Sequence, residues 1–224
     1  MTESVLVIQN VSDLDLVQTL DCGQSFRWTQ IADHSFAGVA FGRAVTVTLD
    51  GTNLRIENAP ESDRALWEDY FDLSLDYGGI RRELSALHPV LHEAADYAAG
   101  IRILRQEPYE ALCTFIISQN NNIKRIKGIV QRLCELLGER LPDGAFAFPE
   151  AEKLAALNPD DLAPLRAGFR NRYLIDAARK VADGDVDLEK CRACAYDEAR
   201  NELMQITGVG VKVADCTLLF GLTG

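Results

Sequence analysis

The stretch Leu203-Met-Gln-Ile-Thr-Gly-Val-Gly-Val-Lys-Val-Ala-Asp-Cys216 decides the fold of the second half of this 224-residue chain. An apolar run leads into a Gly-Val-Gly turn, and a helical pattern follows directly. Gly208 and Gly210 can adopt backbone conformations that other residues avoid, so two helices can meet there in a tight hairpin. The amide groups at the start of the second helix suit a phosphate. The pattern predicts a helix-hairpin-helix DNA-binding element, with Lys212 in the first turn of its second helix.

A second informative stretch covers residues 115–126 and reads Phe-Ile-Ile-Ser-Gln-Asn-Asn-Asn-Ile-Lys-Arg-Ile. Asparagine is a poor helix former, so Asn120, Asn121 and Asn122 predict a break between two helices. Taken alone, the triplet fits a solvated loop or an asparagine-rich helix cap as well as it fits a functional element. An asparagine amide also offers a donor and an acceptor, which allows it to contact the edge of a base.

Composition excludes several classes of protein. The hydrophobic fraction of 47% supports a core in one large or two small domains, and no apolar run is long enough to span a bilayer. No signal segment opens the chain, and the six cysteines show no disulfide rhythm. Cys191 and Cys194 form a C-x-x-C without a second pair, which indicates reduced thiols in a cytosolic protein. His34, His88 and His92 do not group as ligands, so we assign no metal and no cofactor.

The net charge of −11 and the pI of about 4.8 argue, by themselves, against binding to nucleic acid. The distribution of charge weakens this argument. Residues 102–132 hold six basic and two acidic side chains, and residues 164–180 hold five basic and one acidic. Charges farther apart than about 8–10 Å are largely screened, so local basic surfaces can still attract DNA. Non-specific affinity should nevertheless be weaker than that of a basic protein.

The hydrophobic pattern predicts an α+β fold. An N-terminal antiparallel β-sheet domain is expected over residues 1–95, packed on a mainly α-helical helix-hairpin-helix domain over residues 96–224. The expected strands lie near 5–8, 25–31, 37–41, 44–49 and 54–56. The expected helices lie near 62–72, 78–87, 91–98, 108–118, 122–137, 150–156, 159–163, 169–183, 195–205 and 210–221.

Four motifs together resemble one family. Gly23-Gln-Ser-Phe-Arg-Trp28, Leu104-Arg-Gln-Glu-Pro108, the asparagine triplet and the hairpin follow one another in the order typical of 8-oxoguanine DNA glycosylases with abasic-site lyase activity. The resemblance runs from about residue 14 to the last residue. It implies a base-excision repair enzyme that flips 8-oxoguanine out of double-stranded DNA, where it is paired with cytosine. It also implies a monomer without a cofactor or a membrane partner, located at the nucleoid in the cytoplasm or in a nucleus.

The resemblance assigns the chemistry to three residues. It implies that the amine of Lys212 attacks the sugar C1′, expels the base and forms a Schiff base that permits β-elimination. It implies that the backbone carbonyl of Gly23 accepts the N7 hydrogen of 8-oxoguanine, which guanine lacks. Cys216 would pack on the flipped base. Without the resemblance, Lys212 could be a surface lysine and Cys216 a small buried residue.

The same resemblance assigns the recognition of the opposite strand. Asn120 would fill the gap left by the flipped nucleotide, and Arg125 and Arg170 would read the orphan cytosine with their bidentate guanidinium groups. Phe169 aligns with an aromatic wedge that unstacks the duplex. Taken alone, the two arginines could be solvated surface residues and Phe169 a core residue at a helix start.

One feature of the family is not found. The family carries a catalytic aspartate in a Pro-Val-Asp motif beyond the lysine helix, and the sequence reaches Gly224 without it. Asp215 is expected to be structural and not a substitute. We therefore expect a fragment of a longer protein, with excision by residues 1–224 much slower than by an extended form. The alternatives are a glycosylase for another damaged base and a non-catalytic helix-hairpin-helix module that binds DNA or senses damage.

Overall fold

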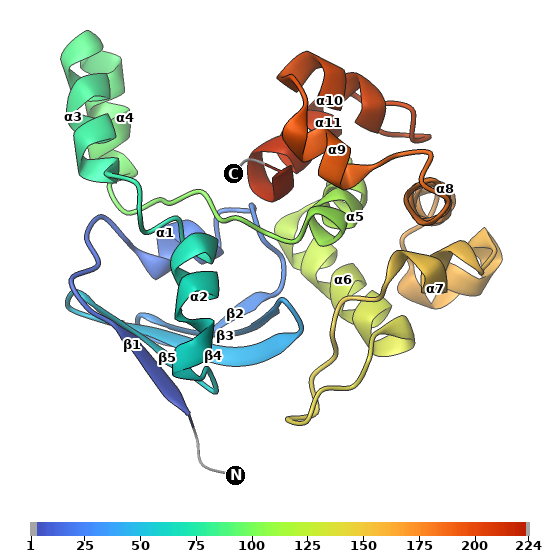
Figure 1. The fold of residues 1–224 in the computed structure, drawn as a ribbon, viewed down its shortest axis with the longest axis horizontal. Helices are drawn as coiled ribbons and strands as arrows, with labels where there is room; N and C mark the ends of the chain where they lie inside the picture. Colours follow the sequence, from blue (N-terminus) through green and yellow to red (C-terminus); the bar gives the residue numbers. More distant parts are fainter. Residues whose placement is uncertain (1–3, 223–224) are drawn as a thin grey trace. The chain divides into compact units, whose positions relative to one another are not determined.

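The computed structural model describes residues 4–222 and divides them into two compact units. The first unit comprises the residues up to Gly38 together with Arg43–Leu104. The second comprises Val39–Gly42 together with the residues from Arg105 onward. The predicted α+β class is confirmed, because an antiparallel sheet forms from the N-terminal residues and the second unit is mainly helical (Figure 1).

Five strands form one sheet in the order β1-β5-β4-β3-β2. Their bounds are Val5–Ile8 (β1), Trp28–Ala32 (β2), Ser35–Ala40 (β3), Arg43–Asp50 (β4) and Asn53–Glu57 (β5). Ile56 pairs with Leu6 on one side and Val47 on the other, and all three side chains are fully buried. Since side chains alternate along a strand, this register places the apolar positions on one face.

The helices of the first unit complete its core. They are α1 (Leu16–Leu20), η1 (Glu61–Asp63), α2 (Arg64–Tyr70), α3 (Tyr77–Leu87) and α4 (Pro89–Tyr97). Trp67 and Tyr70 on α2 and Phe71 after it are buried, and the Trp28 indole donates a hydrogen bond of 2.7 Å to the Tyr70 hydroxyl. Helix α1 was not predicted, because five residues are too few to show a helical period. Its one sequence signal is Asp15, which caps it by accepting from the Gln18 amide.

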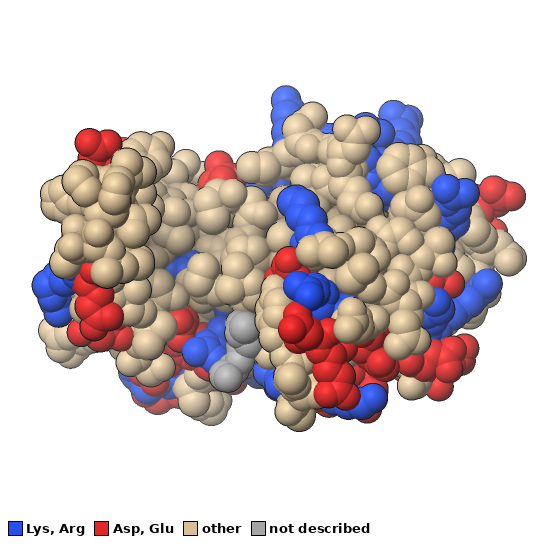
Figure 2. All heavy atoms as spheres, turned by 90° about the horizontal axis from the view of Figure 1, so that it is seen from above, with Lys and Arg blue, Asp and Glu red and all other residues tan. Residues whose placement is uncertain are grey.

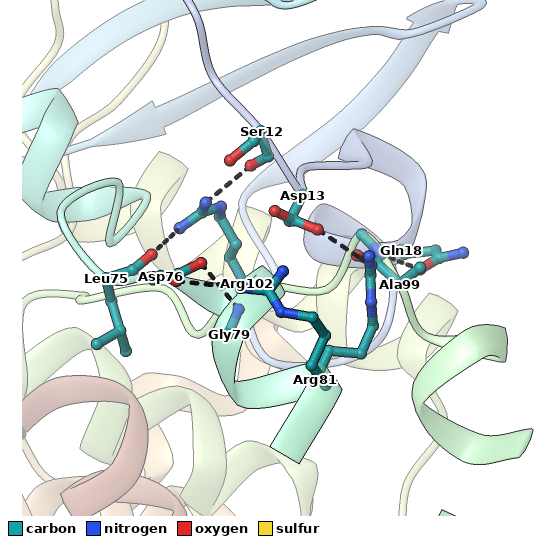
Figure 3. A network of polar contacts seen from close by, with 11 residues as sticks. Ser12, Asp13, Gln18, Leu75, Asp76, Gly79, Arg81, Ala99 and Arg102 are labelled. Carbon is teal, nitrogen blue, oxygen red and sulfur yellow. Dashed lines mark hydrogen bonds and ion pairs between the residues drawn. The ribbon is translucent and has the colours of Figure 1, made fainter. Parts of the chain in front are cut away.

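A buried arginine braces the loops of the first unit (Figure 3). Arg102 is only 2% exposed, and its guanidinium donates to the carbonyls of Asp72 at 2.6 Å and Ser12 at 2.7 Å. It also lies 4.4 Å from the centre of the Tyr77 ring. Burial lowers the pKa of Arg102, while the nearby Tyr77, Asp72 and Asp13 act in the opposite direction. One side chain thus ties the segment before α1 to the segment after α2.

The second unit is built around α5. Its helices are α5 (Pro108–Ser118), α6 (Ile123–Leu137), α7 (Ala151–Ala155), η2 (Pro159–Leu165), α8 (Arg170–Ala182), α9 (Leu188–Ala193), α10 (Tyr196–Leu203), α11 (Val211–Thr217) and η3 (Leu218–Leu222). Every residue of α5 from Glu110 to Ile117 is buried. Phe220 stacks on Phe115 with ring centres 5.4 Å apart, which holds η3 against α5.

Two predicted helices have a different form, and a second short helix was missed besides α1. The element at Pro159–Leu165 is a 3-10 helix with Pro164 inside it, and a proline lacks the N–H that an α-helix needs there. The helix expected over 210–221 is α-helical only to Thr217 and then makes one π-helical turn. Helix α9 is another short helix that periodicity did not reveal; Asp187 caps it by accepting from two amides.

Charge is patchy on the surface. On the face drawn in Figure 2, the Asp and Glu side chains gather in patches, and Lys and Arg side chains lie both beside these patches and apart from them. The net charge of −11 is therefore compatible with local basic regions. Within residues 4–222 no helix has the length and apolarity needed to cross a bilayer. All six cysteines are free thiols.

Candidate functional site

The hairpin connects α10, which ends at Leu203, to α11, which begins at Val211. Gly208 has a φ of +83°, and a Cβ at this position would collide with the ring of Tyr173. A glycine is thus required here both by backbone conformation and by close packing. Gly210 caps α11 with a φ of −101°, which any residue can adopt, so the conformational argument for this glycine was wrong. Apart from its chain neighbours, no atom lies within 4 Å of a Cβ built at Gly210, and the residue is exposed.

Lys212 is the second residue of α11, and its side chain is exposed. The predicted place of this lysine in the first turn after the hairpin is confirmed. Cys216 lies one turn further along the same face and is half-buried. Burial raises the pKa of the Cys216 thiol, and the Lys212 ammonium offsets this only in part. At neutral pH the lysine therefore has an uncharged, polarisable side chain beside it.

Asp215 points toward α10. Its carboxylate lies 4.0 Å from a guanidinium nitrogen of Arg200. A hydrogen bond to Asp215 also raises the pKa of Tyr196. These contacts agree with the structural role expected for Asp215.

The three asparagines between α5 and α6 have three different environments. Asn121 donates from its amide to the Ile117 carbonyl at 3.1 Å and closes the end of α5. Asn122 caps α6 by accepting from the Arg125 amide at 3.0 Å. Asn120 is exposed, has a left-handed φ of +46°, and has no hydrogen-bond partner for its side chain among the described residues. Of the triplet, Asn120 is the residue whose side-chain amide makes no hydrogen bond to the described residues.

Arg170 braces this loop from the start of α8. It is 3% exposed, so the alternative of a solvated arginine is wrong for this residue. Its guanidinium donates to the carbonyls of Gln119, of Asn120 at 3.0 Å and of Ala167 at 2.9 Å. Burial lowers the pKa of Arg170, and the neighbouring Arg125 lowers it further. In this structure the hydrogen-bonding fork expected to read a cytosine is occupied by backbone carbonyls.

Phe169 and Arg125 flank Arg170 on the surface. Phe169 is 47% exposed, so the alternative of a core residue is wrong as well. Its ring lies beneath the Arg170 guanidinium at 4.5 Å and meets the Tyr173 ring edge-on at 5.6 Å. The Arg125 side chain is exposed, with one weak bond of 3.4 Å to the Arg166 carbonyl. An exposed aromatic ring, an amide without a hydrogen bond and a cation without an ion pair among residues 4–222 are thus brought together in the second unit.

Gly23 belongs to the first unit and has a φ of +94°, a conformation that favours glycine. The next residue, Gln24, is buried and fixes this turn. Its amide donates to the carbonyls of Thr19 at 2.7 Å and Arg102 at 2.8 Å, and its oxygen accepts from the Leu104 amide at 3.0 Å. Gln24 lies within the motif Gly23–Trp28, but no role was predicted for it; its place directly after Gly23 was the available signal.

The described residues contain no group of three or more His, Cys, Asp or Glu side chains that could hold a metal ion. Residues 6–112 match the family model of the 8-oxoguanine DNA glycosylase N-terminal domain. Residues 113–216 match the model of the HhH-GPD superfamily base excision DNA repair protein. The chain belongs to the 8-oxoguanine DNA glycosylase family.

Members of this family with known structures or activities extend the comparison. The Clostridium acetobutylicum 8-oxoguanine glycosylase/lyase, in complex with double-stranded DNA containing cytosine opposite 8-oxoguanine, is 38% identical with a TM-score of 0.93. The alignment covers 98% of this chain and 78% of that one. The N-glycosylase/DNA lyase of Saccharomyces cerevisiae is 32% identical over 95% of this chain, and the N-glycosylase/DNA lyase OGG1 of Arabidopsis thaliana is 27% identical over 94%. The chain spans 64% and 61% of the length of these two relatives.

Proposed function

We propose that this protein removes 8-oxoguanine paired with cytosine from double-stranded DNA and cleaves the resulting abasic site through Lys212. The observation that carries the proposal is the place of Lys212. It is an exposed amine in the first turn of α11, directly after a Gly-Val-Gly hairpin, in a chain of the 8-oxoguanine DNA glycosylase family.

The reaction uses the amine as a nucleophile. The unprotonated Nζ of Lys212 forms a bond to C1′ of the flipped nucleotide while the C1′–N9 bond breaks, and the proton that the amine then loses is taken up by the departing purine. The ring-opened sugar is then held as an imine. Loss of a proton from C2′ expels the 3′ phosphate and nicks the strand. The neutral thiol of Cys216, on the same face of α11, supplies a packing surface for the extruded base.

Recognition of the lesion is assigned to Gly23 and recognition of the orphan cytosine to the loop braced by Arg170. The glycine turn, fixed by Gln24, presents a backbone carbonyl that accepts from the N7 hydrogen of 8-oxoguanine. The free amide of Asn120 enters the gap in the duplex, and the exposed ring of Phe169 unstacks the adjacent step. Arg125 contacts the cytosine directly.

Three further features support contact with a duplex. Arg170 and Arg125 are neighbouring cations, and their combined positive charge attracts a polyanion such as DNA. For Arg170 to read cytosine it must exchange carbonyl bonds for bonds to the base. The hairpin at Gly208 and Gly210 contacts the phosphate backbone. Asn121 and Asn122 support Asn120 by closing the two flanking helices.

Single-turnover excision tests the proposal. A duplex with 8-oxoguanine opposite cytosine is incubated with excess protein, and base release and strand nicking are followed separately. Matched duplexes carry guanine, an alkylated purine or an oxidised pyrimidine at the same position. We expect residues 1–224 to release 8-oxoguanine slowly, as the sequence predicts, with a nick that depends on Lys212. Faster release of an alkylated purine would favour the alternative of a glycosylase for another base, and binding without trapping of any abasic site would favour a non-catalytic module.

A further inference from the structure

The turn before Lys212 is held by side chains from α8. Tyr173, Asp176 and Lys180 are spaced three and four residues apart, which places them on one face of that helix. Each contacts a different residue of the segment between α10 and α11. None of the three was singled out from the sequence, because helical spacing alone does not reveal which loop a face will meet.

Asp176 makes the central contact. Its carboxylate accepts from the Thr207 backbone amide at 2.7 Å, and the Thr207 side chain donates to it as well. Burial raises the pKa of Asp176, but the hydrogen bonds from Thr207 and the charge of Lys180 outweigh burial and hold it below the usual value. The carboxylate is therefore ionised at neutral pH, and its bonds to the turn are charge-assisted.

Lys180 and Tyr173 hold the turn on either side of Thr207. The Lys180 ammonium donates to the Gln205 carbonyl and lies 3.4 Å from the Asp176 carboxylate. The ring of Tyr173 fills the space where Gly208 has no side chain. Helix α8 thus holds the segment from Gln205 to Gly208 at three points: the Gln205 carbonyl, the Thr207 amide and the backbone of Gly208.

We propose that Asp176 is a positioning residue for Lys212; this rests on the proposed role of Lys212 as the nucleophile. Helix α11 begins at Val211, so the turn from Gln205 to Gly208 sets the direction in which its first turn, and the amine, projects. In the segment between α10 and α11, Thr207 and Gly210 are exposed. The buried residues Ile206 and Val209 have apolar side chains, which cannot form hydrogen bonds to the backbone of the turn. Attack on C1′ depends on placing the amine within a fraction of an ångström, so loosening the turn slows the reaction while the protein stays folded.

The test compares Asp176→Ala with Asp176→Asn, which keeps an oxygen that can accept from Thr207. Asp183→Ala is the matched control, because Asp183 is exposed at the end of the same helix and its loss changes the net charge equally. The substrate is a duplex with an aldehydic abasic site opposite cytosine. The Lys212 amine condenses with the aldehyde and releases water, and borohydride reduces the imine to a stable adduct. The rate of trapping is measured under single-turnover conditions over a range of protein concentrations.

We expect Asp176→Ala to lower the trapping rate at saturation by about tenfold or more, with the half-saturating concentration unchanged. Asp176→Asn should recover most of the rate, and Asp183→Ala should match the unaltered chain. If Asp176 had a merely structural role, its loss would lower thermal stability without lowering the saturated trapping rate at an unchanged half-saturating concentration. A saturated rate for Asp176→Ala equal to that of Asp183→Ala would overturn the inference.

Two further measurements separate this inference from the proposed function. Hydrogen exchange at the Thr207 amide can be measured without any enzyme activity and should become faster in Asp176→Ala. Unchanged exchange would refute the contact between Asp176 and the turn, which we call the clamp. If the unaltered chain forms no adduct, the proposed function fails, and the clamp is still judged by this exchange. If Asp176→Ala does not fold, Lys180→Met removes the bond to Gln205 and should lower the saturated rate in the same direction.

Discussion

Each unit of this protein contains an arginine that is buried and bonded to backbone carbonyls, yet the two arginines brace different kinds of structure. Arg102 in the first unit holds Ser12 and Asp72 in segments far from it in sequence, with carboxylates and a tyrosine ring nearby. Arg170 in the second unit holds the loop that carries Asn120, and its charged neighbour is another arginine. The same chemistry stabilises a core in one case and a loop with a free side chain in the other. The two arginines differ in the charges around them, which are carboxylates for Arg102 and a second arginine for Arg170. They also differ in that the loop held by Arg170 exposes the side chain of Asn120.

The largest effect is expected from Arg102→Met. The substitution keeps most of the volume but leaves the carbonyls of Ser12, Asp72 and Leu75 without their donor, and should cost about 3–5 kcal/mol of unfolding free energy. Urea denaturation measures the loss. Arg81→Met is the control, because its ion pair with Asp13 is partly exposed and should contribute about 1 kcal/mol or less. Equal losses in the two variants would show that Arg102 is not a brace.

Arg170→Met should have a smaller effect on stability and an additional effect on recognition. We expect about 2–3 kcal/mol of lost unfolding free energy, because the bonds to Gln119, Asn120 and Ala167 are removed. The preference for cytosine over adenine opposite the lesion should fall by about 1–3 kcal/mol.

Arg125→Met is the matched variant for recognition. Its side chain is exposed, so it should leave stability nearly unchanged while lowering the same opposite-base preference. Excision from duplexes with cytosine or adenine opposite 8-oxoguanine measures both variants. An unchanged ratio in Arg170→Met would limit that residue to a structural role, and an unchanged ratio in Arg125→Met would remove it from the site.

The smallest effect is expected in the pH dependence of stability, through the ionisation of Tyr77 beside Arg102. Burial raises the pKa of Tyr77 to about 12, against an ordinary value of 10.0. Since the folded state holds this proton more tightly, the contribution to stability is complete below pH 10 and is lost as pH rises toward 12. The loss should be about 1–2 kcal/mol and should be absent from the pH dependence of Tyr77→Phe. The same alkaline slope in both proteins would contradict the assignment.

The elements with long hydrophobic patterns were predicted from the sequence, and so were glycines that adopt a positive φ, such as Gly208. The bounds of α5 and the place of Lys212 in α11 agree with prediction. Short helices such as α1 and α9 were missed because their signals are single capping residues. The roles of Gln24, Arg102 and Asp176 depend on partners that lie far away in sequence, and no local pattern specifies such partners. Conversely, the asparagine triplet was correctly placed between two helices with capping as one possible role, and the structure shows which of its members bond the helix ends.

The central claim is that the amine of Lys212 forms the covalent intermediate. Borohydride trapping on a duplex with an abasic site opposite cytosine tests it, with Lys212→Gln beside the unaltered chain and Lys190→Gln as a control at a lysine outside the hairpin. We predict an adduct with the unaltered chain and with Lys190→Gln, and none with Lys212→Gln, while all three bind the duplex. Normal trapping by Lys212→Gln would contradict it, because another amine would then be the nucleophile.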